Sequence, residues 1–153
     1  MKTIVRKLLP ILLATAILVF TLASCNGGVD DEGNCRVVLA DGEDITEYTV
    51  NLSEVEGDEG LFSVLDALNK NGMPLVTRDG AFGKELISVG SLVPDPLKRE
   101  YVRILTSVES DFDTSAWFYE TEYDGVRLGT SGFGASGMTI KKDGVFYLEI
   151  ATY

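Results

Sequence analysis

Residues 61–72 read LFSVLDALNKNG, and this stretch decides the fold that the sequence predicts. Leu61, Leu65 and Leu68 recur at spacings of three and four residues, which places them on one face of a helix. Asn71-Gly72 is a typical end signal for that helix. A helix of only about three turns needs tertiary packing to be stable, so we expect its apolar face to lie against a sheet.

Segments on both sides of this helix have the composition of strands. In the segment before it, Tyr48, Val50 and Leu52 alternate with polar residues, which is typical of a half-buried strand. Near the C-terminus, Asp143-Gly144 is typical of a two-residue hairpin turn, so the last two strands should pair with each other. One helix among antiparallel strands predicts an α+β fold with the helix on one face of the sheet. The predicted strands are residues 35–39, 46–52, 75–77, 85–89, 101–108, 116–122, 138–142 and 145–151.

The N-terminal segment has the pattern of an export signal, in which basic residues precede an apolar run (residues 8–22). This run is shorter than the roughly 20 residues that a membrane-spanning helix needs. Leu22-Ala23-Ser24-Cys25 resembles the lipobox of bacterial lipoproteins, in which the cysteine sulfur receives diacylglycerol and the chain is cut just before the cysteine. The resemblance implies that residues 1–24 are a signal peptide and that Cys25 is lipidated. The mature protein would then be held outside the cytoplasm on a bacterial membrane.

The remainder of the chain predicts a short tether and one domain. Residues 25–34 are polar, acidic and rich in glycine, which favours a flexible tether, and residues 35–153 form a single α+β domain. The net charge of −11 argues against nucleic acid as a partner, because nucleic-acid surfaces select basic patches. If Cys25 is lipidated, Cys35 has no disulfide partner, and its place in a strand predicts a buried thiol.

Several motifs in the C-terminal two thirds together resemble a known domain family. These motifs are Ser63–Leu68, Phe82-Gly83 with Ile87–Val89, Ala116–Tyr119 and Lys142–Gly144. Their order is similar to that of the transcobalamin C-terminal-like domains of bacterial lipoproteins and surface proteins. The resemblance covers residues 60–153 and implies a β-grasp-like fold with one helix across a small mixed or antiparallel sheet. Vertebrate members of the family, in transcobalamin and intrinsic factor, cover one face of a corrinoid, so the resemblance implies a corrinoid as the first ligand to test.

The residue inventory predicts that this protein is not an enzyme. The chain contains no histidine, which excludes Ser-His-Asp and Cys-His catalysis and zinc sites with histidine ligands. We therefore expect no catalytic residues, no metal site and no cofactor. Glu109, Asp111 and Asp113 alternate and could share one side of a turn, but they lack the spacing of a calcium loop. A solvated acidic surface and a weak calcium site both stay open as interpretations.

Residues 132–137 read GFGASG, which matches a dinucleotide-binding fingerprint. That motif binds a pyrophosphate only where a helix follows it, and the residues that follow here have a strand pattern, so we reject nucleotide binding. The segment is then either a plain loop or a loop whose bare backbone approaches a flat ligand.

Aromatic residues are concentrated in the last third of the chain, with ten of the fourteen between Tyr101 and Tyr153. On a strand, Phe118 would point into the core and its two aromatic neighbours would point to the other side. Exposed aromatic rings beside a glycine-rich loop suit stacking on a flat ligand, although packing inside the domain would use the same residues. The candidate ligand-binding residues are Trp117, Tyr119, Tyr123, Phe133 and Gly134.

These observations predict a surface-anchored lipoprotein that acts as a non-catalytic ligand-binding module. The ligand would be a small molecule such as a corrinoid, or a glycan or peptide. The alternative is a structural or protein-interaction lipoprotein of the cell envelope that has no small-molecule ligand.

Overall fold

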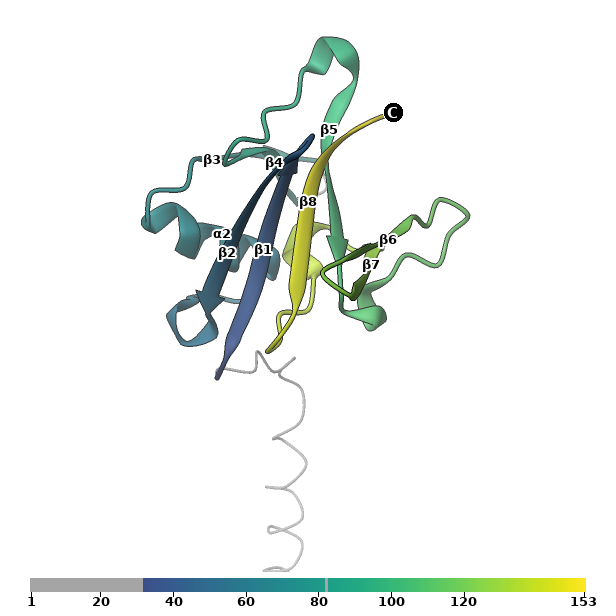
Figure 1. Ribbon diagram of the computed structural model, residues 1–153. Helices are drawn as coiled ribbons and strands as arrows, with labels where there is room; N and C mark the ends of the chain where they lie inside the picture. The colour runs from purple at the N-terminus through teal and green to yellow at the C-terminus, as the bar shows by residue number, and fades with distance from the viewer. Residues whose placement is uncertain (1–31, 82) are drawn as a thin grey trace, which may run out of the picture.

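The computed structural model describes residues 32–81 and 83–153, and this part of the chain is mostly β structure (Figure 1). It contains eight strands, one α-helix and four short 3-10 helices. The predicted signal peptide, Cys25 and most of the predicted tether lie outside the described residues. In the described ranges, no helix combines the length and the apolar character that a membrane span would require.

Six of the strands form one mixed sheet in the order β2-β1-β8-β5-β7-β6. The neighbours β1 and β8 are parallel, and all other pairs are antiparallel. The strands β3 and β4 form a separate antiparallel pair. The strand bounds are β1 Asn34–Asp41, β2 Asp44–Asn51, β3 Leu75–Gly80, β4 Gly83–Val89, β5 Glu100–Thr106, β6 Glu120–Tyr123, β7 Val126–Thr130 and β8 Val145–Thr152. The helices are α2 Leu61–Lys70, η1 Leu52–Glu54, η2 Pro96–Lys98, η3 Glu109–Asp111 and η4 Ala135–Gly137.

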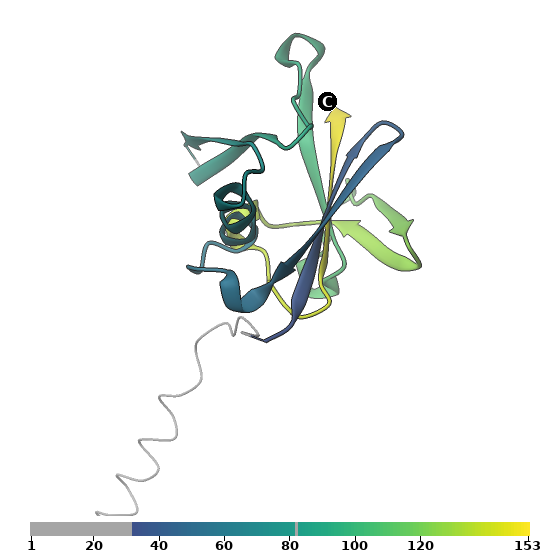
Figure 2. The ribbon, with the colours of Figure 1, turned by 60° about the vertical axis from the view of Figure 1, so that its left-hand side comes forward.

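The main core lies between one face of the sheet and a layer built from α2, the β3–β4 pair and η4 (Figure 2). Val37 and Leu39 of β1 and Phe146 and Leu148 of β8 supply the sheet side, and Leu65 of α2 is completely buried against the same cluster. Burial of these apolar side chains is the main favourable term for folding.

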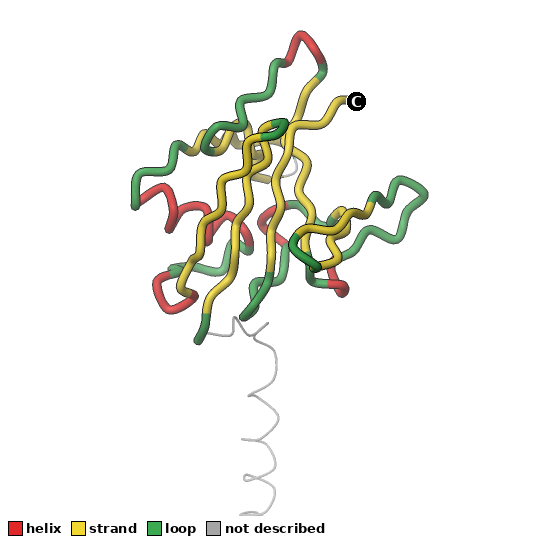
Figure 3. Tube along the Cα trace, in the orientation of Figure 1, coloured by secondary structure: helices red, strands yellow, loops and turns green. Residues whose placement is uncertain are grey.

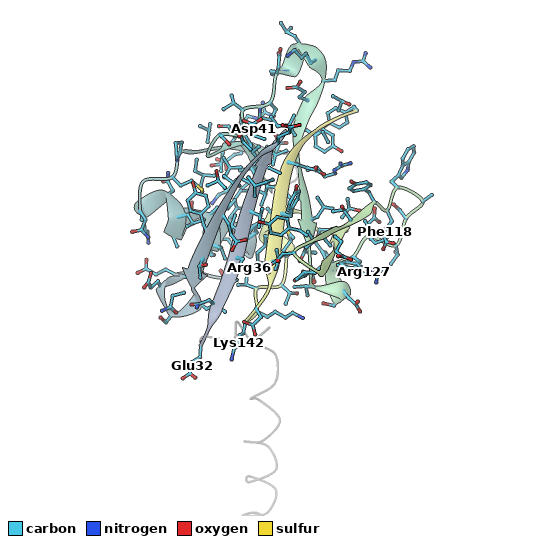
Figure 4. The ribbon with its side chains drawn as sticks, viewed as in Figure 1. Glu32, Arg36, Asp41, Phe118, Arg127 and Lys142 are labelled. Carbon is cyan, nitrogen blue, oxygen red and sulfur yellow. The ribbon has the colours of Figure 1, made fainter. Side chains whose placement is uncertain are left out.

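The β6–β7 hairpin curls over the opposite face of the sheet (Figures 1 and 2). It packs there on a smaller apolar cluster of Val38, Leu105, Leu128 and Val145, all of which are fully buried. Arg36 of β1 points toward this hairpin and forms an ion pair with Asp124 in its turn, at 3.3 Å (Figure 4).

The predicted fold class, a β-grasp-like α+β fold with one main helix on a small sheet, is wrong. The helix lies where the sequence predicts it, over residues 61–70, but it is the only α-helix in the described ranges. The short segments predicted as extended at 75–77 and 85–89 are longer in the structure, where they are β3 and β4 and form a second sheet. This second sheet and the helix together cover one face of the main sheet. The described residues therefore form a mostly β fold with two sheets.

Two predicted strands are also wrong. Residues 116–119 form a loop, and the strand begins only at Glu120. Residues 138–142 are not a strand, so the predicted C-terminal hairpin does not form. The reason is that β8 lies inside the sheet, with β1 on one side and β5 on the other, which leaves no free edge for a hairpin partner.

Cys35 is completely buried, as its strand position predicts. Burial disfavours the charged thiolate and raises the pKa of the Cys35 thiol to about 11, although a backbone hydrogen bond acts in the opposite direction.

Candidate ligand-binding grooves along β5

The strand β5 is paired along only part of its length on the side away from β8. It pairs with β7 at Leu105 and Thr106, and then β7 ends at Thr130. The first residues of β5, from Glu100 to Arg103, therefore have a strand neighbour on one side only within the described residues. Figure 1 shows that β6 and β7 reach only the lower part of β5.

The first groove, which we call the interlayer groove, lies between β4 and the unpaired part of β5. Its volume is about 510 Å³. Val102 and Ile104 of β5, Leu86 of β4 and Phe62 of α2 contribute its apolar surface. The loop that carries Pro94 and the segment at Gly134 border the same groove.

The second groove, which we call the aromatic groove, adjoins the first around Gly134. Its volume is about 280 Å³. Trp117 and Phe133 line it from two different loops, and Arg103 lines it from β5. The two grooves share Tyr101, Val102, Ile104, Gly134 and Ala135, so they form a continuous depression along the unpaired part of β5.

Trp117 is 88% exposed and lies on the loop between η3 and β6, which extends beyond the β6–β7 hairpin (Figure 3). Local hydrogen bonds shape this loop. The Asp113 carboxylate accepts from the backbone N–H of Ser115 at 2.8 Å and from its hydroxyl at 2.7 Å. Ser115 Oγ in turn accepts from the backbone N–H of Trp117 at 3.2 Å. The two bonds from Ser115 lower the pKa of Asp113, so the carboxylate stays charged and keeps the turn in place.

Phe118 anchors the same loop to the protein. Its ring lies 5.5 Å from the ring of Phe112, centroid to centroid, and packs on the bare backbone of Gly129. A Cβ atom at Gly129 would lie 2.7 Å from Phe118 Cε2, so this packing requires glycine. The sequence predicts Phe118 in the core, and this prediction is wrong. Phe118 is half-buried in its contact with Phe112 and Gly129 and is not part of the main core.

Tyr119 lies beside the aromatic groove rather than in its lining. Its ring stacks with the Arg103 guanidinium, which is 4.1 Å from the ring centroid. Arg103 also donates two hydrogen bonds to Glu149 Oε1, at 2.9 and 2.6 Å. Tyr119 therefore positions a charged wall residue of the groove.

The structure brings Phe133 and Gly134 together with Trp117 in the lining of the aromatic groove. Phe133 is 54% exposed, and its backbone N–H donates to Ser131 Oγ at 3.1 Å. A Cβ atom at Gly134 would have no neighbour within 4 Å, so the backbone faces open space at the junction of the two grooves.

Tyr123 does not line either groove. Its ring lies 5.5 Å from that of Tyr147 and packs on the smaller apolar cluster, and its hydroxyl donates to Glu47 Oε2 at 3.2 Å. Desolvation by burial raises the pKa of Tyr123, and the hydrogen bond to Glu47 raises it further. Its role in the structure is to hold the β6–β7 hairpin against the sheet.

Sequence reasoning missed Tyr101 and Tyr153, whose rings stack with centroids 4.5 Å apart at the edge of the interlayer groove. The missed signal is strand pairing, because β5 and β8 place Tyr101 beside Ala151, two residues from Tyr153. A further cavity of about 300 Å³ lies at the start of α2, and its described lining combines glycines with the acidic Asp58, hydroxyl residues and aliphatic side chains, and contains no aromatic ring.

The three alternating acidic residues do not converge. Asp111 is buried and accepts hydrogen bonds from the backbone N–H and the hydroxyl of Thr139, at 2.6 and 2.8 Å. Glu109 pairs with Arg127 at 3.5 Å, and Asp113 binds Ser115 as described above. Within residues 32–81 and 83–153, no group of three or more histidine, cysteine, aspartate or glutamate side chains is arranged to hold a metal ion.

Comparison with known proteins adds information about the fold. No protein-family model matches the sequence. No curated protein matches it either. Among solved structures, the chain is similar to a protein of Ruminococcus gnavus ATCC 29149 for which metal binding has been suggested, with a TM-score of 0.53 and 14% identity over 80% of this chain and 99% of that one. It is also similar to haptocorrin in complex with Cbi, with a TM-score of 0.53 and 13% identity over 86% of this chain and 28% of haptocorrin. The chain therefore spans about a quarter of the length of haptocorrin, and the likeness to both proteins is one of fold.

Proposed function

We propose that this protein is a non-catalytic ligand-binding module whose ligand lies in the aromatic groove. The observation that carries the proposal is the position of Trp117 and Phe133. Two large apolar side chains from separate loops are exposed beside the open backbone of Gly134, at a groove that also contains a positioned guanidinium. Exposed aromatic rings around a concavity are typical of sites that bind flat or ring-shaped ligands.

A corrinoid is the first ligand to test. Haptocorrin, which has a similar fold, binds the corrinoid Cbi. The aromatic groove offers the features that a planar ring with polar edges requires. Trp117 and Phe133 supply apolar surface, and the Arg103 guanidinium can donate to polar groups at the rim of the ligand. A glycan or a planar aromatic compound uses the same chemistry, so each serves as a second probe of the same groove.

The same proposal includes the membrane anchor at Cys25. The described chain begins at the end of the sheet where Glu32 lies, and η2 and the start of β5 lie at the opposite end (Figures 1 and 4). A lipid at Cys25 would therefore hold the module by one end and leave the unpaired part of β5 at the end remote from the anchor.

Titration with cobinamide, followed by its visible absorption spectrum, tests the proposal. The full-length chain in mild detergent should shift the spectrum saturably, and Trp117→Ala or Phe133→Ala should weaken binding. Tyr123→Ala is the matched control because that ring lies outside the groove. Absence of a spectral change up to roughly 1 mM ligand, which corresponds to a binding free energy weaker than about −4 kcal/mol, would reject a corrinoid ligand.

The competing function is a structural or protein-interaction lipoprotein of the envelope. One observation favours it independently, namely the unpaired edge of β5.

A further inference from the structure

The hydrogen bonds at the two ends of β5 establish which of its backbone groups face β8. The backbone N–H of Tyr153 donates to the carbonyl of Arg99 at 3.2 Å, and the N–H of Ser107 donates to the carbonyl of Val145 at 2.9 Å. In an antiparallel pair the backbone groups of successive residues alternate between the two sides. The odd-numbered residues of β5 therefore bond to β8, and the even-numbered residues direct their N–H and C=O groups away from it.

On that second side, the hydrogen bonds end before the strand does. The carbonyl of Ile104 accepts from the N–H of Ser131 at 3.5 Å, and the N–H of Glu100 donates to the carbonyl of Asp95 at 3.2 Å. Between them, Val102 has neither a donor nor an acceptor for its outward N–H and C=O among the described residues. Val102 as a residue is half-buried, so part of it remains accessible in the free protein.

Among the residues that the structure describes, no strand occupies the position beside this edge, which we call the vacant row, because β7 turns away. After Ser131, the chain leaves β5, and the N–H of Gly132 bonds to the carbonyl of Asp111 at 2.9 Å. The interlayer groove lies beside the face of β5 that carries Val102 and Ile104, and the aromatic groove extends past the edge to Arg103, which alternation places on the other face. Side chains of a strand alternate between its two faces, so a strand in this row would direct them alternately into the two grooves.

We propose that this edge of β5 binds an extended peptide segment of another protein, which adds to the sheet in the row that β7 vacates. Main-chain hydrogen bonds to Val102 would hold the peptide, and side-chain pockets on alternate positions would select it, as in other cases of strand addition. The interlayer groove, with Phe62, Leu86 and Ile104, selects an apolar side chain. The aromatic groove selects an aromatic or polar side chain that contacts Trp117 or Arg103.

The shape of the site argues for a single strand rather than a second copy of this protein. The unpaired edge spans only Glu100 to Arg103, and Pro94, Pro96 and the Gly134 turn border it. A second folded copy would need a long, open edge, and short, bordered edges are a known device against such pairing. A single extended segment needs no more than the row itself.

This inference goes beyond the proposed function and does not depend on it. A peptide would be held by the backbone of Val102 and could gain one side-chain contact with Trp117, whereas the planar ligand depends on the rings of both Trp117 and Phe133. Failure of cobinamide to bind would therefore leave this inference standing, and failure of peptides to bind would leave the other.

The experiment uses the full-length chain in mild detergent and a phage-displayed library of random heptapeptides as the probe. A selected peptide is synthesised with and without N-methylation at alternate backbone positions. Val102→Pro removes the outward N–H without breaking a bond to β8, and Val102→Ala is the matched control that shortens the side chain but keeps the N–H. We expect Val102→Pro and one N-methylated series each to weaken binding about tenfold, and Val102→Ala to stay within about threefold of the wild type.

Amide hydrogen exchange gives a second readout that does not require a folded proline variant. In the free protein, the Val102 amide should exchange faster than those of its neighbours Tyr101 and Arg103, and the peptide should slow it at least tenfold. Failure to select any peptide, equal binding by the proline and alanine variants, or a Val102 amide already protected in the free protein would each overturn the proposal. Protection that grows with protein concentration without peptide would assign the edge to a second copy and would overturn it as well.

Discussion

Arg103 and Tyr119 form one of the contacts that join the loop carrying Trp117 to the sheet. The guanidinium of Arg103 lies 4.1 Å from the centroid of the Tyr119 ring while it donates two hydrogen bonds to Glu149. One residue of the central sheet is therefore held by an adjacent strand and by the loop that carries Trp117. This arrangement gives the aromatic groove a rigid wall on β5 and links the position of the loop to the sheet.

A double-mutant cycle measures this link. Arg103→Gln and Tyr119→Leu should show a coupling free energy of about 0.5–1 kcal/mol in urea unfolding, the usual range for a cation–π pair that is partly exposed. The control cycle pairs Tyr119→Leu with Lys70→Gln. Lys70 lies at the end of α2 in the opposite layer, where it pairs with Glu56, so these two changes should be additive. A coupling near zero for Arg103 and Tyr119 would show that the contact does not position the loop.

The buried thiol of Cys35 gives a prediction about reactivity. With a pKa of about 11, only about a thousandth of the thiol is ionised at pH 8, and burial blocks access to it. In the Cys25→Ser variant, where Cys35 is the only thiol, Ellman's reagent should react slowly with the folded protein and rapidly in denaturant. Rapid labelling of the folded protein at pH 8 would contradict the buried position.

The same pKa predicts how stability changes with pH. The pKa of Cys35 is raised in the folded state, so the unfolded chain loses its proton first. The contribution of the thiol to the free energy of unfolding is therefore complete below about pH 9 and is lost as the pH rises toward about 11. In urea unfolding between about pH 9 and pH 11, the Cys35→Ala variant should not show this decrease in the free energy of unfolding. If both proteins show the same dependence on pH, the raised pKa of Cys35 is disproved.

Lipidation at Cys25 is a prediction from the sequence that two matched variants can test. Cells expressing the protein are fed an alkyne analogue of palmitate, and label on the protein is then measured. The label should disappear in Cys25→Ala and remain in Cys35→Ala, since Cys35 is buried inside the domain. Label that survives Cys25→Ala would refute the lipoprotein interpretation.

Local sequence patterns predicted those elements whose signals are local. The helix over residues 61–70 is confirmed because its apolar spacing and its end signal lie within the segment itself. The first two strands are confirmed because alternation and a short turn are also local features. The loop at 116–119 has aromatic residues that favour a strand, but hydrogen bonds between Asp113, Ser115 and Trp117 fold the backbone into turns instead.

Long-range pairing explains the remaining errors. The hairpin predicted from Asp143-Gly144 does not form, and the N–H of Asp143 donates instead to the carbonyl of Asn34, which belongs to β1. Nothing near residue 145 indicates that β8 will lie between β1 and β5. For the candidate site, sequence reasoning brought together Trp117, Phe133 and Gly134. It could not exclude Tyr123 or find Tyr101 and Tyr153, because the register of strands far apart in the chain places those rings.

The fluorescence of Trp117, the only tryptophan in the chain, tests the central claim most directly. Its exposed indole should be quenched saturably when cobinamide, or a planar aromatic or glycan probe, enters the aromatic groove, and Phe133→Ala should raise the apparent Kd while Tyr123→Ala leaves it unchanged. The account predicts a binding curve that responds to Phe133 and not to Tyr123. Quenching that is linear in probe concentration up to roughly 1 mM, and identical in both variants, would contradict it.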